Sequence, residues 1–193
     1  MKKYELTSET KIVFGHILYR IKALSSFGCV SAGDLGGFLE SEKNLSQNGN
    51  AWVFGNAEVY GNAEVYGNAR VYGDAWVYGD ARVYGNAWVF GNAEVYGDAR
   101  VSGDARVSGD AEVSKIGSIF WIGAVGSRND TATFFRCTDG VIRVTCGCFF
   151  GNLDEFAKKV RKTHGDNDHA KVYMLAIDMA KIRISTEKEK TEE

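Results

Sequence analysis

The sequence has no excess of charge of either sign and no long apolar run, and each absence excludes a class of protein. Its 23 basic and 25 acidic side chains leave a formal net charge of −2, so the basic excess of a nucleic-acid-binding protein is missing. No stretch is long and apolar enough to cross a membrane. The opening segment, Met1 to Leu6, lacks the apolar core of a signal peptide. We therefore expect a cytoplasmic protein with neither nucleic acid nor a membrane as a partner.

Cysteine is also scarce, and its spacing gives little support for a metal site. In the cytoplasm the four cysteines are expected to stay reduced. Cys146 and Cys148 are separated by one residue, which is weaker evidence for zinc than a CxxC pair. We therefore interpret the cysteines as small core residues and expect neither a metal nor a cofactor. The four are Cys29, Cys137, Cys146 and Cys148.

A single six-residue phrase fills the centre of the chain, from Asn50 to Lys115, and occurs eleven times without an insertion. Alanine is second and valine fourth in every copy, and residues two apart share one face of an extended chain. We expect both to point inward and the residues on either side of the valine to point outward. Glycine followed by Asn or Asp tolerates positive φ and turns a corner. Three such sides close a coil of about eighteen residues, and stacked coils form a parallel β-solenoid.

Placing every third repeat on the same side predicts outward columns of side chains. The first side alternates Trp52, Arg70, Trp88 and Arg106, an order that predicts cation–π contacts between coils. Beside these columns run aromatic ladders, each of which ends in serine. Stacked rings stiffen a strand ladder, whereas exposed rings mark binding surfaces, and the sequence is compatible with both. The ladders are Phe54, Tyr72 and Phe90; Tyr60, Tyr78 and Tyr96; and Tyr66 and Tyr84.

The segments that flank the repeats are expected to cap the solenoid. Residues 4–7 and 11–24 alternate like strands, with a turn at Thr7 to Thr10. The irregular, glycine-rich segment that follows, from Phe27 to Gly49, is typical of a degenerate first coil. We therefore predict an N-terminal β-hairpin and capping coil at 1–49, the solenoid at 50–115, a C-terminal domain at 116–185 and a disordered charged tail at 186–193.

The C-terminal domain is predicted to be a β-hairpin followed by two helices. A two-residue loop at Asp139 and Gly140 pairs Thr138 with Val141. Asn152 is a suitable N-cap for the first helix, and a second helix is expected from about His169 to Ile184. The hairpin register places two sets on opposite faces: Phe135, Cys137, Ile142, Val144, Cys146 and Cys148 on an apolar face, and Phe134, Arg136, Arg143 and Thr145 on an outer face.

The repeated phrase resembles the hexapeptide repeat of left-handed parallel β-helices, and the left-handed sense is implied by that resemblance alone. The flanks carry a second resemblance, to small uncharacterised phage and prophage hexapeptide-repeat proteins, which implies a phage origin and assigns no residue roles. The similar C-terminal segments are Thr131 to Arg136, Cys146 to Phe149 and Thr163 to Asp166, and the similar N-terminal segments are Tyr19 to Leu24 and Gly33 to Phe38. The expected fold is therefore mainly β, a left-handed parallel β-helix with a β cap and a small α+β domain.

Hexapeptide β-helices are best known as acyltransferases, and the resemblance to those enzymes would require a histidine base on or near a coil. His16, His164 and His169 all lie outside the repeats, and no loop interrupts the coils. We interpret His164 and His169 as capping, solvent-facing groups and expect no catalytic residue. A zinc enzyme of similar fold needs three converging histidines and is disfavoured further.

Our hypothesis is a non-enzymatic binding protein that acts in the host cytoplasm and interferes with a host defence process. It would dock on a host protein or sequester a small anionic ligand. An acyltransferase and a self-assembling structural protein, a homo-oligomer through the flat β-helix faces, are the alternatives. Tyr, Trp and Arg dominate binding hot spots, so the aromatic coils and the outer hairpin face are the predicted surface. Its residues are Trp52, Tyr60, Trp76, Tyr78, Trp88, Arg136 and Arg143.

Overall fold

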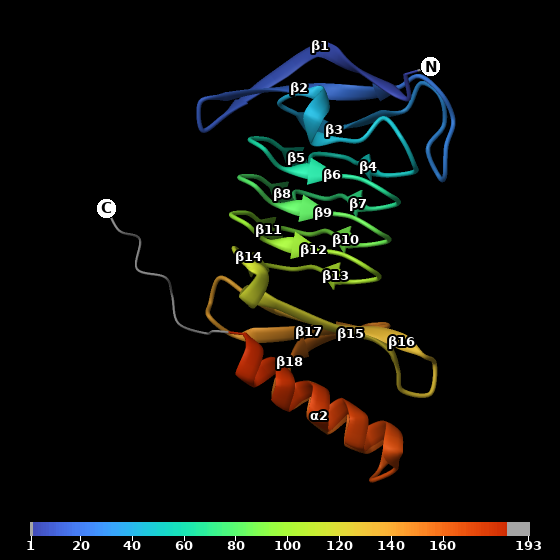
Figure 1. The fold of residues 1–193 in the computed structure, drawn as a ribbon, viewed down its shortest axis with the longest axis vertical. Coiled ribbons are helices and arrows are strands. Elements are labelled where there is room, and N and C mark those ends of the chain that lie inside the picture. Colours follow the sequence, from blue (N-terminus) through green and yellow to red (C-terminus); the bar gives the residue numbers. More distant parts are fainter. Residues whose placement is uncertain (1, 185–193) are drawn as a thin grey trace.

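The computed structural model describes residues 2–184 as a column with three parts (Figure 1). A β-solenoid forms the centre, a sheet covers its N-terminal end, and a second sheet with two helices covers its C-terminal end. The tail at 186–193, which we expected to be disordered, lies outside the described residues.

The solenoid makes about four turns, and each of its three sides is a parallel sheet of two-residue strands. Within each side, consecutive strands lie one coil apart and pair in parallel, as Trp52 does with Arg70. The first side is β4-β7-β10-β13, the second contains β5-β8-β11-β14, and the third is β6-β9-β12. The predicted three-sided coil is confirmed. The strands are β4 Trp52–Val53, β5 Glu58–Val59, β6 Glu64–Val65, β7 Arg70–Val71, β8 Trp76–Val77, β9 Arg82–Val83, β10 Trp88–Val89, β11 Glu94–Val95, β12 Arg100–Val101, β13 Arg106–Val107 and β14 Glu112–Val113.

The solenoid interior contains the alanine and valine of every repeat, and their exposed fractions are 0–1%. At the corners the glycines adopt positive φ, and space is tight. A Cβ added to Gly85 would lie 2.9 Å from the backbone nitrogen of Gly103, so a larger residue there would push two coils apart. Asparagine side chains also link the coils, since Asn50 donates to Asn68 and Asn68 donates to Asn86, both at 3.1 Å.

The N-terminal cap is an antiparallel hairpin joined edge-on to the second side of the solenoid. Strand β1 (Tyr4–Val13) pairs with β2 (His16–Ala23), and β3 (Leu35–Leu39) connects β2 to β5. Below them, in the short helix η1 (Glu42–Asn44), the Asn44 side chain donates to the carbonyls of Gly61 and Ala63. The first coil is thereby covered.

The turn expected at Thr7 to Thr10 is wrong. The chain turns at Phe14 and Gly15, whose φ angles are 46° and 85°, the left-handed pair that suits a two-residue hairpin. The Thr7 to Thr10 segment lies inside β1, where the register shifts between Leu6 and Thr10. Its polar residues reflect an exposed strand rather than a turn.

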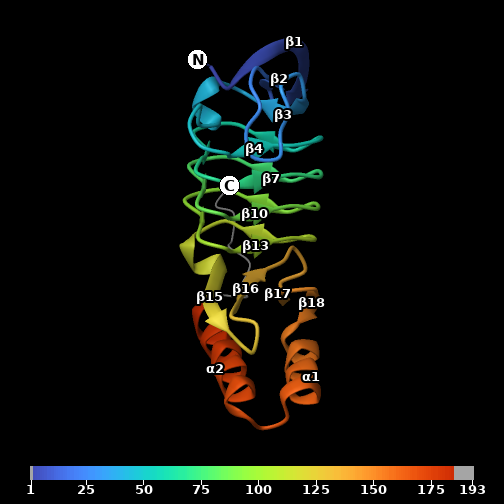
Figure 2. The same ribbon diagram turned by 90° about the vertical axis from the view of Figure 1, so that its right-hand side faces the viewer.

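The C-terminal sheet has four strands rather than the predicted two, in the order β15-β16-β17-β18. Strands β15 and β18 were missed because the first carries a glycine and the second is only four residues long. The sheet lies between the last coil and the helices (Figure 2). After the short helix η2 (Ile116–Ser118), the strands are β15 Ile119–Val125, β16 Asp130–Arg136, β17 Ile142–Cys146 and β18 Phe149–Asn152.

The predicted hairpin register is also wrong, by one residue. Arg136 lies opposite Ile142, and the Cys137 amide donates to the Val141 carbonyl at 3.0 Å. The loop therefore has three residues, with Gly140 at φ 79°. A one-residue shift reverses the relative faces of two strands.

Both faces of the hairpin are covered, which is why the apolar pattern did not reveal its register. Phe135 and Cys137 belong to the solenoid core, whereas Phe134, Val144 and Cys146 belong to the core under the helices. The cysteines that we placed on one apolar face, Cys137 and Cys146, thus lie on opposite faces. Phe134 and Thr145, predicted to be on an outer face, are buried.

Helices α1 (Leu153–His164) and α2 (Asp168–Arg183) pack side by side against this sheet (Figure 2). Asn152 accepts a hydrogen bond from the Glu155 amide, and the Glu155 carboxylate accepts one from the Asn152 amide, both at 2.9 Å. This capping box fixes the start of α1 at the predicted residue. The second helix is confirmed close to its expected range, and its inner face is buried with the capping residue that follows it: Ala170, Tyr173, Ile177, Ala180 and Ile184.

We predict that Val83→Asp destabilises the protein by about 4 kcal/mol or more, because the solenoid interior offers no partner for a charge. Thermal unfolding followed by circular dichroism measures the effect. The matched control is Arg82→Asp, which introduces the same carboxylate on the exposed outer face of the same strand. It should change stability by no more than about 0.5 kcal/mol. Equal losses in the two variants would contradict the inward placement of the valines.

Candidate functional site

The structure does not gather the predicted binding residues into one surface, and it buries several of them. Trp52, expected to be exposed, has an exposed fraction of 1%, with its ring in edge contact with Tyr4 and Phe27. Tyr60 is also buried, between the rings of His16 and Tyr78. Both predictions fail because the N-terminal cap covers the first coil.

The two predicted arginines are held by carboxylates. Arg136, predicted to be exposed, is 4% exposed and forms an ion pair of 2.9 Å with Glu112 of the last coil. Arg143 forms two hydrogen bonds with Asp139, of 2.8 and 2.6 Å, and hydrogen bonding from Arg143 lowers the pKa of Asp139 to about 2. Arg136 therefore joins the sheet to the solenoid, and neither arginine needs a ligand to balance its charge.

The first side of the solenoid retains a half-exposed aromatic groove. Arg70 and Arg106 lie over the Trp88 ring, at 5.3 and 4.9 Å from its centroid, which confirms the predicted cation–π contacts. Tyr72 stacks on Phe90 with centroids 4.9 Å apart. The groove has a volume of about 360 Å³ and is lined by Cys29, Phe54, Arg70, Tyr72 and Trp88.

On the second side the predicted rings stack along the coils. Tyr78 lies between Tyr60 and Tyr96, at centroid distances of 5.1 and 5.0 Å, and the Phe14 ring at the hairpin tip contacts Trp76. Trp76 and Tyr78 are half-buried, and burial raises the pKa of Tyr60 and Tyr96 to about 12. These rings therefore pack against one another and against the cap.

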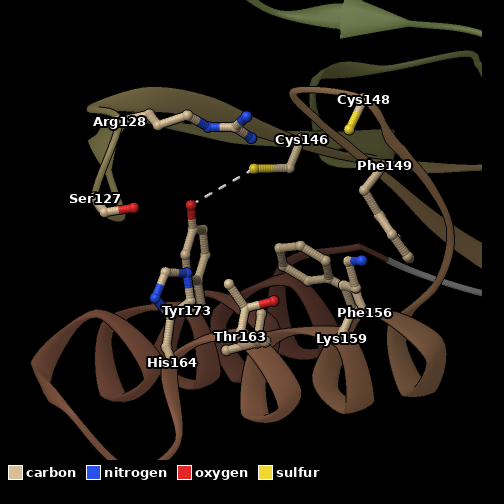
Figure 3. A pocket seen from close by; sticks show the side chains of 11 residues that line it. Ser127, Arg128, Cys146, Cys148, Phe149, Phe156, Lys159, Thr163, His164 and Tyr173 are labelled. Atoms are coloured by element: carbon tan, nitrogen blue, oxygen red, sulfur yellow. Dashed lines mark hydrogen bonds between the residues drawn. The ribbon is translucent and has the colours of Figure 1, made fainter.

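A deeper hollow lies between the C-terminal sheet and the helices (Figure 3). Its volume is about 400 Å³. The sheet side supplies Ser127 and Arg128 from the β15–β16 loop, and the helices supply Lys159, His164 and Tyr173. The remaining lining residues are Cys146, Cys148, Phe149, Phe156, Val160 and Thr163. We call this hollow the interlayer pocket.

Local backbone geometry places Arg128 over the pocket. Gly147, in the turn between β17 and β18, has a φ of 58°, and a Cβ there would lie 2.6 Å from Nη2 of Arg128. A side chain at this turn would displace the guanidinium. Glycine thus satisfies the left-handed turn and leaves room for the arginine.

The interlayer pocket combines an apolar wall with basic groups. Its lining includes Arg128, Lys159 and His164 and no carboxylate. Within residues 2–184, neither Arg128 nor Lys159 forms an ion pair. Asp130 lies outside the lining but near Arg128, since a Cβ at Gly147 would lie 2.6 Å from Nη2 of Arg128 and 3.3 Å from Oδ2 of Asp130. The lining itself is basic and suited to an anion.

The back of the pocket is closed by a thiol and a phenol. Sγ of Cys146 lies 3.7 Å from the Tyr173 hydroxyl, which also donates to the Val125 carbonyl at 3.5 Å. Burial raises the pKa values of both groups, so both are neutral near pH 7. A neutral thiol is a poor nucleophile, which argues against covalent chemistry by Cys146.

The structure places the two cysteines that we weighed as zinc ligands, Cys146 and Cys148, in the interlayer pocket together with His164. Cys137 lies on the other face of the sheet. Among the described residues, no group of three or more His, Cys, Asp and Glu side chains is arranged to hold a metal ion. Arg128 and Lys159 were missed because neither belongs to a motif, and only the folded chain brings their segments together.

The repeats match a known family of β-solenoids. The model of the YdcK beta solenoid repeat matches residues 63–79, 75–91, 93–109 and 99–114, all inside the central column. No curated protein matches the chain. No helix in the described part of the chain is long and apolar enough to cross a membrane.

We predict that alkaline pH destabilises the tyrosine ladder. Burial raises the pKa of Tyr60 from the ordinary tyrosine value of 10.0 to about 12 in the folded protein, so between these values the folded state binds more protons than the unfolded state. The contribution of Tyr60 to the unfolding free energy is complete below pH 10 and is lost as pH rises toward 12. Urea unfolding at pH 9 and pH 11 should show a fall that is smaller in Tyr60→Phe, and equal falls would contradict the assignment.

Proposed function

We propose that the protein is a non-enzymatic binding protein and that the interlayer pocket takes a small organic anion with an apolar body. The observation that carries this proposal is the convergence of Arg128, Lys159 and His164 on a pocket whose lining contains no carboxylate. Unpaired basic groups are costly to hold near one another, and an anion relieves that cost.

The size and composition of the pocket support the same ligand class. A volume of about 400 Å³ falls within the range of small-molecule sites, which are mostly apolar with a few placed polar groups. Arg128 suits bidentate recognition of a carboxylate or phosphate, and Lys159 adds a point charge. Phe149 and Phe156 offer apolar surface to the rest of the ligand.

The wider setting of the proposal comes from the resemblances of the sequence. These support a left-handed coil, a phage origin and action in the host cytoplasm, where sequestering a small anion would interfere with a host defence process. Docking on a host protein through the aromatic groove of Arg70, Tyr72 and Trp88 is the second route by which a binding protein would act. The anion is favoured because its pocket is deeper and carries unpaired charge.

Acyl transfer remains a second candidate because of one observation on the solenoid. His16 precedes the repeats by more than thirty residues in the sequence. In the structure it lies against the second side of the solenoid, where its ring centroid is 5.1 Å from that of Tyr60. Its Nδ1 is 2.9 Å from a Glu40 carboxylate oxygen, an arrangement that orients an imidazole as a general base. His16 lines neither of the two hollows described above, so a substrate has no enclosed place beside it.

We predict that the fluorescent anion 1-anilinonaphthalene-8-sulfonate binds the interlayer pocket and that Arg128→Gln with Lys159→Gln weakens this binding at least about tenfold. Fluorescence titration measures the dissociation constant. The matched control is Lys162→Gln, which removes an exposed charge from the same helix outside the pocket and should leave binding unchanged.

Two results would contradict this proposal. One is an equal loss of affinity in Lys162→Gln, which would indicate a general effect of net charge. The other is equally tight binding of the neutral analogue N-phenyl-1-naphthylamine, with no response to the Arg128 and Lys159 substitutions, which would indicate a purely apolar site elsewhere.

We expect no turnover of acetyl-coenzyme A with a panel of amines and sugars, because the only histidine on the described solenoid surface has no enclosed substrate site. Release of free coenzyme A measures the reaction. His169→Gln, an exposed histidine on α2, is the control for His16→Gln. Turnover that disappears in His16→Gln alone, with an unchanged melting temperature, would establish the enzyme and defeat the binding-protein proposal.

A further inference from the structure

Helix α2 is apolar on its outer face as well as on its buried face. Four large side chains are exposed in a row, with exposed fractions of 39% for Val172, 64% for Leu175, 50% for Met179 and 88% for Ile182. They are separated by three, four and three residues, so they share one stripe of the helix. We call them the α2 outer stripe. Figure 1 shows α2 at the end of the column farthest from the N-terminal cap.

The neighbouring helix provides an internal comparison. Among the exposed positions of α1 are Asp154, Lys158, Arg161 and Lys162, and its apolar residues Phe156 and Val160 are buried. α1 is therefore an ordinary amphipathic surface helix. Both helices pack on the same sheet, yet only α2 exposes a row of large apolar side chains. Such a contiguous apolar patch indicates a surface that another protein covers.

We propose that the α2 outer stripes of two copies of this chain pack against each other as an antiparallel, two-fold symmetric helix pair. This interface differs from self-association through the solenoid faces, and it does not depend on the ligand of the interlayer pocket.

The spacing of the stripe favours a second copy as the partner. A three-four-three pattern reads the same in both directions, so a two-fold axis beside residue 177 places Val172 opposite the partner's Ile182 and Leu175 opposite the partner's Met179. Each layer then contains one smaller or branched side chain and one longer one. A two-fold interface must be complementary to itself in this way.

The helix dipoles favour the antiparallel direction, because antiparallel packing opposes the two dipoles and parallel packing aligns them. The charged side chains at the helix ends do not decide the direction. Asp168 in the first turn pairs with Lys171, and Lys181 in the last turn pairs with Asp178, so these four side chains are balanced within each copy.

Residues 185–193 have no composition suited to cover the stripe. The residues that follow α2, at 185–193, are Ser, Thr, Glu and Lys without one apolar side chain. Such a segment cannot replace water over Leu175 and Ile182. A second copy supplies the same four apolar residues, at the same spacing, on a rigid helix.

Sedimentation equilibrium of the full chain over a wide concentration range tests the proposal. We expect a reversible dimer whose dissociation constant rises about 100-fold or more in Leu175→Glu, because two carboxylates enter an apolar contact. Phe14→Glu is the matched control, since Phe14 is 77% exposed on the hairpin at the opposite end of the column. A monomer at every concentration, or a dimer that responds to Phe14→Glu and not to Leu175→Glu, would overturn the proposal.

Cysteine cross-linking tests the direction of packing, in a background where Cys29 and Cys148 are replaced by serine. A mixture of Leu175→Cys and Met179→Cys chains should form a disulfide-linked heterodimer under mild oxidation, because those positions face each other in the antiparallel pair. Leu175→Cys alone should stay uncross-linked. Cross-linking of Leu175→Cys with itself would indicate a parallel pair and refute the proposed symmetry.

Discussion

A stack of parallel coils leaves a row of unpaired backbone groups at each end, and the rest of this structure depends on how those ends are covered. Inside the solenoid, every coil satisfies its neighbours, as in the bond of 2.9 Å from the Glu58 amide to the Ala75 carbonyl. The terminal coils have a neighbour on one side alone. Exposed strand edges recruit other chains, so the folded monomer needs a specific cover for each end.

The two ends are covered by different contacts, and at each end these contacts bury outward residues of the repeats. At the N-terminal end, β3 continues the second side of the solenoid as a parallel strand, and Tyr4 and Phe27 pack on Trp52. At the C-terminal end, Thr133 accepts the Arg106 amide hydrogen bond, and Arg136 pairs with Glu112. Outward residues of the terminal coils are thus buried at each cover, as Trp52 is at one end and Ser108 at the other.

The sequence predicts the solenoid coils well because the same pattern of inward Ala and Val and a corner residue occurs in eleven consecutive repeats. Ala–x–Val fixes the inward face, and glycine fixes the corners, so the strand register follows from counting. In the segments before and after the repeats, each strand or turn signal occurs only once, so no second copy tests the interpretation. The polar segment from Thr7 to Thr10 reads equally well as a turn or an exposed strand, and only the φ angles of Phe14 and Gly15 locate the turn. In the C-terminal hairpin both faces are covered, so the apolar pattern reveals neither the register nor the burial of Arg136.

The candidate site was missed for a related reason. A repeat places equivalent residues at every coil, which suits extended aromatic surfaces, but a pocket needs residues that occur once. The interlayer pocket lies where the period has ended: Arg128 comes from one loop, Lys159 from α1 and Tyr173 from α2, and no spacing in the sequence relates them. The sheet that seals the solenoid has a second face, and that face must be covered by helices in turn. One face of the sheet packs on the last coil and the other packs on α1 and α2. The interlayer pocket lies on the helix side, so the sheet that closes the solenoid also supplies one wall of the candidate site.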